Sequence, residues 1–298
     1  MTERRAPNPR ARTTVRRLLS AGLALLAAAF LVAPPAAALA PPTPRDFVSN
    51  LDLECFRTTE YQPPSTRLTL RHLNPVLVDQ PPVQVVLGPR GQLCVPVAKN
   101  GVIPPPGVLD YIRFVDLSCY RVSGPLSGKS LALRHLNPVL QNLPGLNVTL
   151  LAPVQLCVPV AKNGVIPGPD VLRVISHIDL LCYAHQPNPA VGLPLTLTQL
   201  NPVLTSQIPT RSIRVTAARQ LCVPVQKSSD EIPPDVLDLV RWIDLLKFDT
   251  DGIAISPVSL NLRHLNPVLA NLPGEELRII SPSQLAVPVA KNGVIPPG

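Results

Sequence analysis

The chain has 298 residues and a formal net charge of +8, with 46% apolar residues, 3% aromatic residues, 39 prolines and six cysteines. Six arginines and one glutamate in the first 40 residues account for +5 of that charge, which leaves +3 for the rest. So small a charge, with few aromatic residues and no basic run, excludes nucleic-acid binding as an expected function.

The first 40 residues have the organisation of an export signal. Arginines precede an apolar run, Leu18–Ala33, which is shorter than the roughly 20 residues of a membrane-spanning helix. Small residues at positions 38–40 form a cleavage site, so we expect a secreted or periplasmic mature chain that begins at Pro41. Arg16-Arg17 fits a twin-arginine signal in part, and the general and twin-arginine routes both stay open. With no lipid-attachable cysteine near the cleavage site and no apolar tail before Gly298, we expect no stable membrane anchor after cleavage.

The rest of the chain contains four copies of one sequence unit. Each copy opens with an Asp-Leu-x-Cys-like segment, and these segments start at Leu51, Val115, Ile178 and Ile243, with spacings of 64, 63 and 65 residues. Each copy continues with LNPVL, a variable apolar segment and QLCVPV, which is QLAVPV in the fourth copy. The repeat predicts an export signal at 1–40 and four units at 41–107, 108–170, 171–234 and 235–298.

Each copy is predicted to contain about four β-strands. Alternation in the second copy puts Val115, Leu117 and Cys119 on one face, which is typical of a strand with one side in a core. The Asn-Pro step of LNPVL favours a turn, since proline cannot donate a ladder hydrogen bond. The Asn-Gly pairs after the closing segment, such as Asn100-Gly101, suit a tight turn with positive φ.

These patterns predict an all-β fold of four tandem modules of about 64 residues each. The segments between copies, such as 104–114, are too apolar for flexible linkers, so neighbouring modules should pack together. We expect an open array. The alternative is a closed four-bladed propeller, since four strands in each of four copies suit that architecture.

The cysteines are expected to pair within copies. The first three copies each contain two cysteines, at Cys55 and Cys94, Cys119 and Cys157, and Cys182 and Cys222. In the fourth copy both equivalent positions have changed together, to Lys247 and Ala286, as loss of an internal bridge requires. The competing scheme joins neighbouring copies and leaves the first and last cysteines without an equivalent partner. A bridge that closes about 39 residues should stabilise a module by roughly 4 kcal/mol.

Histidines recur directly before LNPVL in three copies, at His72, His135 and His264. In the first copy the histidine, both cysteines and Asp52 have ligand types that zinc accepts. The third copy keeps its cysteines but has Gln199 at the histidine position, whereas the fourth copy keeps its histidine without cysteines. Because the two features vary independently, we predict no metal site and assign the histidines to solvent-facing or hydrogen-bonded positions on strands.

One aspartate and one lysine recur in all four copies. The aspartates are Asp52, Asp116, Asp179 and Asp244, and the lysines are Lys99, Lys162, Lys227 and Lys291. We interpret the aspartates as local hydrogen-bond acceptors rather than a catalytic pair or a calcium site. We interpret the lysines as charges that guard an exposed strand edge rather than repeated ligand contacts.

At VDLSCY, LNPVL and QLCVPVAKNG the chain resembles a class of secreted bacterial tandem-repeat β domains of unknown function, which pair an "lCY" strand with an "LCVPVxK" strand. The resemblance covers nearly all of the chain after residue 40, and the fourth copy departs from it by losing both cysteines. It implies an extracytoplasmic β module and assigns no activity or binding residues.

The sequence contains no nucleophile elbow, no metalloprotease helix motif and no phosphate-binding glycine loop. We therefore expect a non-enzymatic secreted structural or binding protein, without catalytic residues, cofactor or metal. Its partner would be an unknown protein or a cell surface, and repetition of one weak surface would raise avidity. The alternative is a secreted hydrolase or its accessory binding domain.

Overall fold

The computed structural model describes residues 39–298, so the predicted export signal lies outside the described residues apart from its last two positions. The described part contains four short helices and thirteen strands, and all of the strands belong to one sheet. The all-β prediction is confirmed. The first three copies each contain the internal disulfide that the sequence predicts.

Each copy consists of a helix, an opening strand, an outer strand and a closing strand, in that order. The helices are α1 (Pro44–Ser49), α2 (Pro106–Ile112), α3 (Pro169–Ile175) and α4 (Pro234–Val240). The opening strands are β1 (Leu53–Tyr61), β5 (Leu117–Arg121), β8 (Leu180–Gln186) and β11 (Leu245–Gly252). The outer strands are β2 (Arg67–His72), β6 (Ser130–His135), β9 (Ala190–Gln199) and β12 (Val258–His264). The closing strands are β4 (Arg90–Lys99), β7 (Leu146–Lys162), β10 (Arg211–Lys227) and β13 (Glu275–Lys291), and the short β3 (Val83–Val86) precedes β4.

The apolar segments between copies form helices α2, α3 and α4, which the strand patterns did not predict. Each helix has proline at its start, where the fixed φ of proline suits the first turn. Apolar residues at positions i, i+3 and i+4, such as Val108, Tyr111 and Ile112, are buried on one face. Neighbouring helices contact one another in a cycle that includes α4 with α1. No helix between residues 39 and 298 has the length and apolar character needed to span a membrane.

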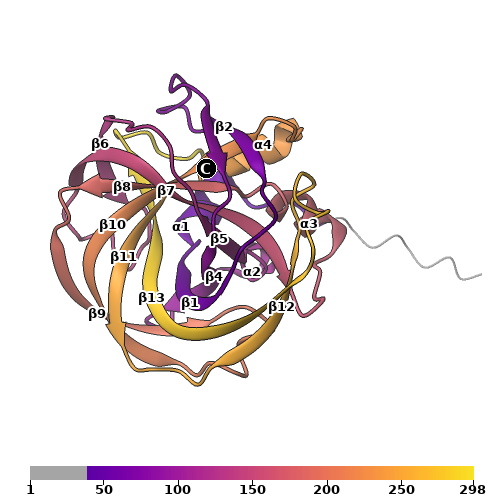
Figure 1. Ribbon diagram of the computed structural model, residues 1–298. Coiled ribbons are helices and arrows are strands. Elements are labelled where there is room, and N and C mark those ends of the chain that lie inside the picture. The colour runs from indigo at the N-terminus through magenta and orange to yellow at the C-terminus, as the bar shows by residue number, and fades with distance from the viewer. Residues whose placement is uncertain (1–38) are drawn as a thin grey trace, which may run out of the picture. The chain divides into compact units, whose positions relative to one another are not determined.

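The opening and closing strands pair into a closed ring. In the order β1, β4, β5, β7, β8, β10, β11, β13, each strand pairs antiparallel with the next, and β13 pairs with β1. Each opening strand therefore lies between the closing strand of its own copy and that of the preceding copy. Figure 1 shows where the ring closes, with β1 (purple) beside β13 (yellow).

The outer strands connect copies that are two apart. The end of β2 pairs with β10, β6 with β13, β9 with β4 and β12 with β7. A 17-residue closing strand such as β7 extends over roughly 56 Å. It therefore pairs with its own outer strand through its first residues and with the outer strand of the opposite copy through its last residues.

The arrangement of the copies differs from the expected open array. An open array leaves an unpaired strand edge at each end, whereas here β1 and β13 pair with each other. The propeller alternative also differs from the structure. The blades of a propeller are separate sheets, but every outer strand here pairs with a closing strand of another copy.

The predicted turns are present and hold the outer layer in place. Asn100 and Gly101 have φ of 50° and 75°, as a turn with positive φ requires. The Asn100 backbone N–H donates to the Thr196 carbonyl at 2.8 Å, and Asn100 Oδ1 accepts from the Thr196 N–H at 2.9 Å. In the LNPVL turn of the first copy, Asn74 Oδ1 accepts from the Val76 N–H at 3.0 Å. Each turn of the Asn-Gly type thus joins two copies on opposite sides of the ring.

One buried cluster fills the ring beside the helices. It combines the inner faces of the helices with leucines and cysteines of the opening strands, among them Leu53, Leu117, Leu180 and Leu245. The C-terminal residues return to the first helix, where the Arg45 N–H of α1 donates to the Pro297 carbonyl at 2.9 Å.

Candidate functional site

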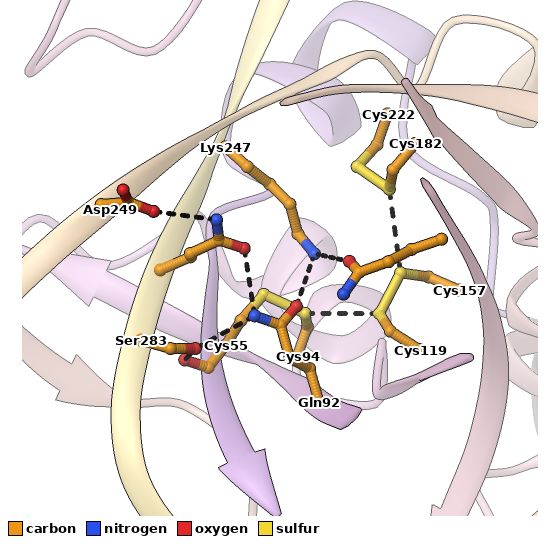
Figure 2. The surroundings of a disulfide bond; sticks show 12 residues. Cys55, Gln92, Cys94, Cys119, Cys157, Cys182, Cys222, Lys247, Asp249 and Ser283 are labelled. Carbon is orange, nitrogen blue, oxygen red and sulfur yellow. Dashed lines mark hydrogen bonds between the residues drawn. A yellow bond between two sulfur atoms is a disulfide. The ribbon is translucent and has the colours of Figure 1, made fainter. Parts of the chain in front are cut away.

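The three disulfides form a continuous row of sulfur atoms inside the ring. Each joins residues that lie directly opposite each other on an opening and a closing strand, as Cys55 does with Cys94. Cys94 Sγ lies 3.6 Å from Cys119 Sγ, and Cys157 Sγ lies 3.8 Å from Cys182 Sγ. Figure 2 shows the three bonds side by side. The row runs through the first three copies and ends where the fourth copy has no cysteine.

Lys247 occupies the place of the missing bridge. Its partner in the register is Ala286, and its side chain is fully buried. The Nζ atom donates to Gln92 Oε1 at 3.0 Å and to Gln155 Oε1 at 2.9 Å. Figure 2 shows the side chain extending toward Gln92 beside the disulfides. A single amine therefore connects the closing strands of the first and second copies.

The glutamines around Lys247 extend this polar network toward the surface. Gln92 Nε2 donates to Gln284 Oε1 at 3.1 Å, and Gln284 Nε2 donates to Asp249 Oδ1 at 3.0 Å. Gln92, Gln155 and Gln284 occupy the same position in their copies, two residues before the cysteine position. In the sequence, Lys247 stands out only as a lost cysteine, and this network was not predicted. The signal for it was the replacement of a cysteine by a long cationic side chain.

Burial lowers the pKa of Lys247 to about 7. An amine with such a pKa has the chemistry of a general base or a nucleophile. Only 1% of this residue is exposed, however, so a substrate cannot reach Nζ. The geometry instead fits a structural role, in which the amine satisfies two buried glutamine carbonyls.

The recurring aspartates and lysines form four equivalent buried ion pairs. The pairs are Asp52 with Lys99, Asp116 with Lys162, Asp179 with Lys227 and Asp244 with Lys291. The prediction that the lysines guard an exposed strand edge is wrong, because each lysine is at most 1% exposed. The prediction that the aspartates are hydrogen-bond acceptors is confirmed, but their asparagine donors are not local and come from other copies.

The asparagine of each LNPVL turn links these ion pairs to the next copy. Asn137 Nδ2 donates to Asp52 Oδ2 at 2.7 Å, and Asn201 does so to Asp116 at 2.7 Å. The cycle closes through Asn74 of the first copy, whose Nδ2 donates to Asp244 Oδ2 of the fourth at 2.7 Å. Each aspartate thus holds a lysine of its own copy and an asparagine of a neighbouring copy. Between residues 39 and 298, no group of three or more histidine, cysteine, aspartate or glutamate side chains is arranged to hold a metal ion.

The recurring histidines lie against the aromatic residues of the opposite copies. His72 Nε2 is 2.9 Å from Tyr183 Oη, and His264 Nε2 is 3.1 Å from Tyr120 Oη. These two histidines are hydrogen-bonded, which is one of the two roles predicted for them. Burial lowers the pKa of His72 to about 4, and the Lys291 charge acts in the same direction.

The third copy has glutamine at the histidine position, and this glutamine lies beside a carboxylate. Gln199 faces the first copy, whose aromatic residue is Phe56 and not tyrosine. Its Nε2 donates to Glu54 Oε2 at 2.9 Å, and Glu54 also forms a buried ion pair with Arg211. The Arg211 guanidinium lies over the Phe56 ring at 5.5 Å from its centre. A neutral donor at position 199 therefore suits a carboxylate partner.

Repeated apolar side chains are exposed at the Asn-Gly turns. The isoleucines after these turns, Ile103, Ile166 and Ile295, are 59%, 57% and 51% exposed. The valines before them, Val102, Val165 and Val294, are also exposed. The first two pairs lie directly before helices α2 and α3, and the third is followed by Pro297, which is hydrogen-bonded to α1. These three exposed Val-Ile pairs, called the apolar points below, thus lie at the end of the ring where the helices are.

The corresponding turn of the third copy has a buried carboxylate, although its other residues, Ser228, Ser229 and Glu231, are exposed. Its Asp230 carboxylate lies 3.2 Å from His177 Nδ1 and accepts from Asn266 Nδ2 at 3.1 Å. The apolar points therefore lie beside α1, α2 and α3, and the turn that precedes α4 has no equivalent Val-Ile pair.

Comparisons with protein-family models, with curated proteins and with solved structures find no match to this chain.

Proposed function

We propose that the chain is a non-enzymatic binding protein of the extracytoplasmic space, and that it contacts a protein partner through the three exposed Val-Ile pairs. The observation that carries the proposal is the recurrence of one exposed apolar pair at equivalent turns of three copies. Exposed apolar side chains that are scattered singly are ordinary. A set placed around one end of a rigid ring has the character of an interaction surface.

The burial of the recurring polar residues supports a role without catalysis. The aspartates and lysines present in every copy form buried ion pairs, and the aspartates also bind asparagines of neighbouring copies. The Val-Ile pairs of three copies, in contrast, are exposed to solvent. Three weak contacts on one rigid body bind with an avidity that a single contact cannot reach.

The location proposed for the protein rests on its cysteines and its first 40 residues. Three disulfides with no free cysteine in the described part are typical of an oxidising compartment. Together with the export signal expected at residues 1–40, they support secretion or a periplasmic location. The resemblance to secreted bacterial tandem-repeat β domains is part of this proposal.

The proposal is tested by removing the apolar points. The triple variant Ile103→Ser, Ile166→Ser, Ile295→Ser should fold as the wild type does and bind intact cells of the producing organism at least tenfold more weakly. The matched control replaces one leucine and two isoleucines that are also about half exposed or more, Leu126→Ser, Ile253→Ser and Ile280→Ser. Protease treatment of the cells should abolish wild-type binding if the partner is a protein. Equal binding by the two triple variants would show that the turns are not the contact surface.

A further inference from the structure

The fourfold repeat produces four equivalent contacts between an aromatic residue and the opposite copy, and in one of them a histidine has no hydrogen-bond partner among the described residues. The aromatic residues are Phe56, Tyr120, Tyr183 and Phe248. In the contacts of Tyr120 and Tyr183, the phenolic hydroxyl meets a histidine Nε2. In the contact of Phe56, the space is occupied by Glu54 and Arg211.

The contact of Phe248 has a histidine but no hydroxyl. The ring of His135 stacks on Phe248 with 5.9 Å between ring centres. Its Nε2 has no hydrogen-bond partner among residues 39–298, and its Nδ1 is buried without one. Leu146 stands at the position that is Arg211 in the third copy and Glu275 in the fourth. Leu246 stands at the position that is Glu54 in the first copy. All of the polar groups that fill the other contacts are therefore missing, except the imidazole.

A cavity of about 290 Å³ lies at this contact. Phe248 and Leu246 of the fourth copy are its buried residues, and exposed Pro144 and Ala190 of the second and third copies lie at its rim. His135 is the one ionisable side chain in its lining. The volume is roughly twice that of an apolar cavity of ~150 Å³ that takes up benzene, so it admits a molecule of about a dozen non-hydrogen atoms.

We propose that this cavity binds a small uncharged molecule with a hydroxyl group on an apolar, preferably aromatic, body. The hydroxyl would bond His135 as the tyrosine hydroxyls bond His72 and His264, and the apolar body would lie against Leu246 and Phe248. A hydroxyl both donates and accepts, so it suits either tautomer of a neutral imidazole.

The electrostatics of the cavity support an uncharged ligand. Burial and the nearby Lys99 charge lower the pKa of His135 to about 4, so the ring is neutral in ordinary conditions. A neutral imidazole cannot pair with a carboxylate or phosphate as a cation would. The site is separate from the exposed Val-Ile pairs, so its occupation and the proposed partner contact can be tested independently.

The ligand class is tested with 2-naphthol and its near-isostere 2-methylnaphthalene, titrated calorimetrically into the exported, disulfide-bonded protein. The expected result is binding of both, with 2-naphthol about fivefold tighter because of one hydrogen bond. In a His135→Leu variant, the two molecules should bind equally. Persistence of the preference in this variant, or no binding of 2-naphthol at millimolar concentration, would overturn the proposal.

A second variant changes the aromatic residue of this contact to tyrosine. Phe248→Tyr places at this contact the residue that the second and third copies carry, so the fold should tolerate it. Its hydroxyl should occupy His135 and weaken 2-naphthol binding at least fivefold, the factor expected from one hydrogen bond. The matched control, Tyr183→Phe, removes a hydroxyl from the equivalent contact of the third copy and should leave binding unchanged. Wild-type affinity in Phe248→Tyr would also contradict the proposal.

Discussion

Lys247 and Ala286 lie directly opposite each other on β11 and β13, at the register that paired cysteines occupy in the other three copies. The amine of Lys247 then reaches past this position to the glutamines of the first and second copies. The fourth copy has therefore exchanged a covalent link within itself for a polar link to two other copies.

The register predicts that a fourth disulfide can be restored. In a Lys247→Cys, Ala286→Cys variant, the new bridge should close a loop as long as that of the first copy, 39 residues. The oxidised variant should be about 4 kcal/mol more stable than its reduced form. Denaturant unfolding with selective reduction of the new bridge measures this difference. Absence of a crosslink between 247 and 286 in peptide maps would contradict the register.

The buried amine predicts a pH dependence of stability. The pKa of Lys247 is lower in the folded protein, about 7, than its ordinary 10.5, so the folded state binds fewer protons between these values. Stability from this group therefore falls as pH decreases from 10.5 to 7 and levels off below 7, with a loss of about 3 kcal/mol between pH 9 and pH 6. The difference in unfolding free energy between wild type and Lys247→Met should show this slope. A difference independent of pH would show that the amine titrates normally.

Ring closure predicts that the first and second copies respond alike to loss of their turn asparagines. Asn74→Ala and Asn137→Ala each remove a 2.7 Å hydrogen bond to a buried aspartate, in the fourth and first copies respectively. Each should cost about 1–3 kcal/mol of unfolding free energy. In an open array, Asn74 would have no partner copy, and its replacement would cost much less. Equilibrium unfolding of the two variants distinguishes these outcomes.

The buried histidines predict sensitivity to acid. The pKa of His72 is lower in the folded protein, about 4, than its ordinary 6.5, so stability is complete above 6.5 and is lost as pH falls through 4. His72→Gln, which imitates Gln199 of the third copy, should remove a loss on the order of 3 kcal/mol. Unfolding at pH 7 and pH 4 measures the effect. Replacement of the exposed neighbour Arg71 by glutamine serves as the control, and an equal change in both variants would refute the assignment.

The disulfides could be predicted because the fourth copy, which has no cysteine, can be compared with the three copies that have two each. Lys247 and Ala286 changed together, and this coupled loss identified the pairing without knowledge of the fold. The turns were also predictable, since Asn100-Gly101 and the Asn-Pro steps determine local backbone conformation regardless of what surrounds them.

The arrangement of the copies could not be predicted in the same way. Besides β3 of its own copy, β2 pairs with β10, which belongs to the copy two units along the chain. No local pattern in β2 or β10 identifies this pairing. For the same reason Lys99 was assigned to an exposed edge, because the strand that covers it comes from the third copy. A signal for the long-range pairing was present in one place. Tyr120 and Tyr183 face histidines and Phe56 faces Gln199, although Phe248, which faces His135, departs from this correlation.

The pairing of each outer strand with a closing strand two copies along has a consequence for how such a protein could arise. A polypeptide with a single copy can make these strand pairs only as a ring of four chains, and one with two copies only as a dimer. Gene duplication with fusion therefore turns an assembly into a monomer without changing any strand pair. Once fused, the four equivalent positions are free to diverge, because a substitution no longer appears at every position of the ring at once.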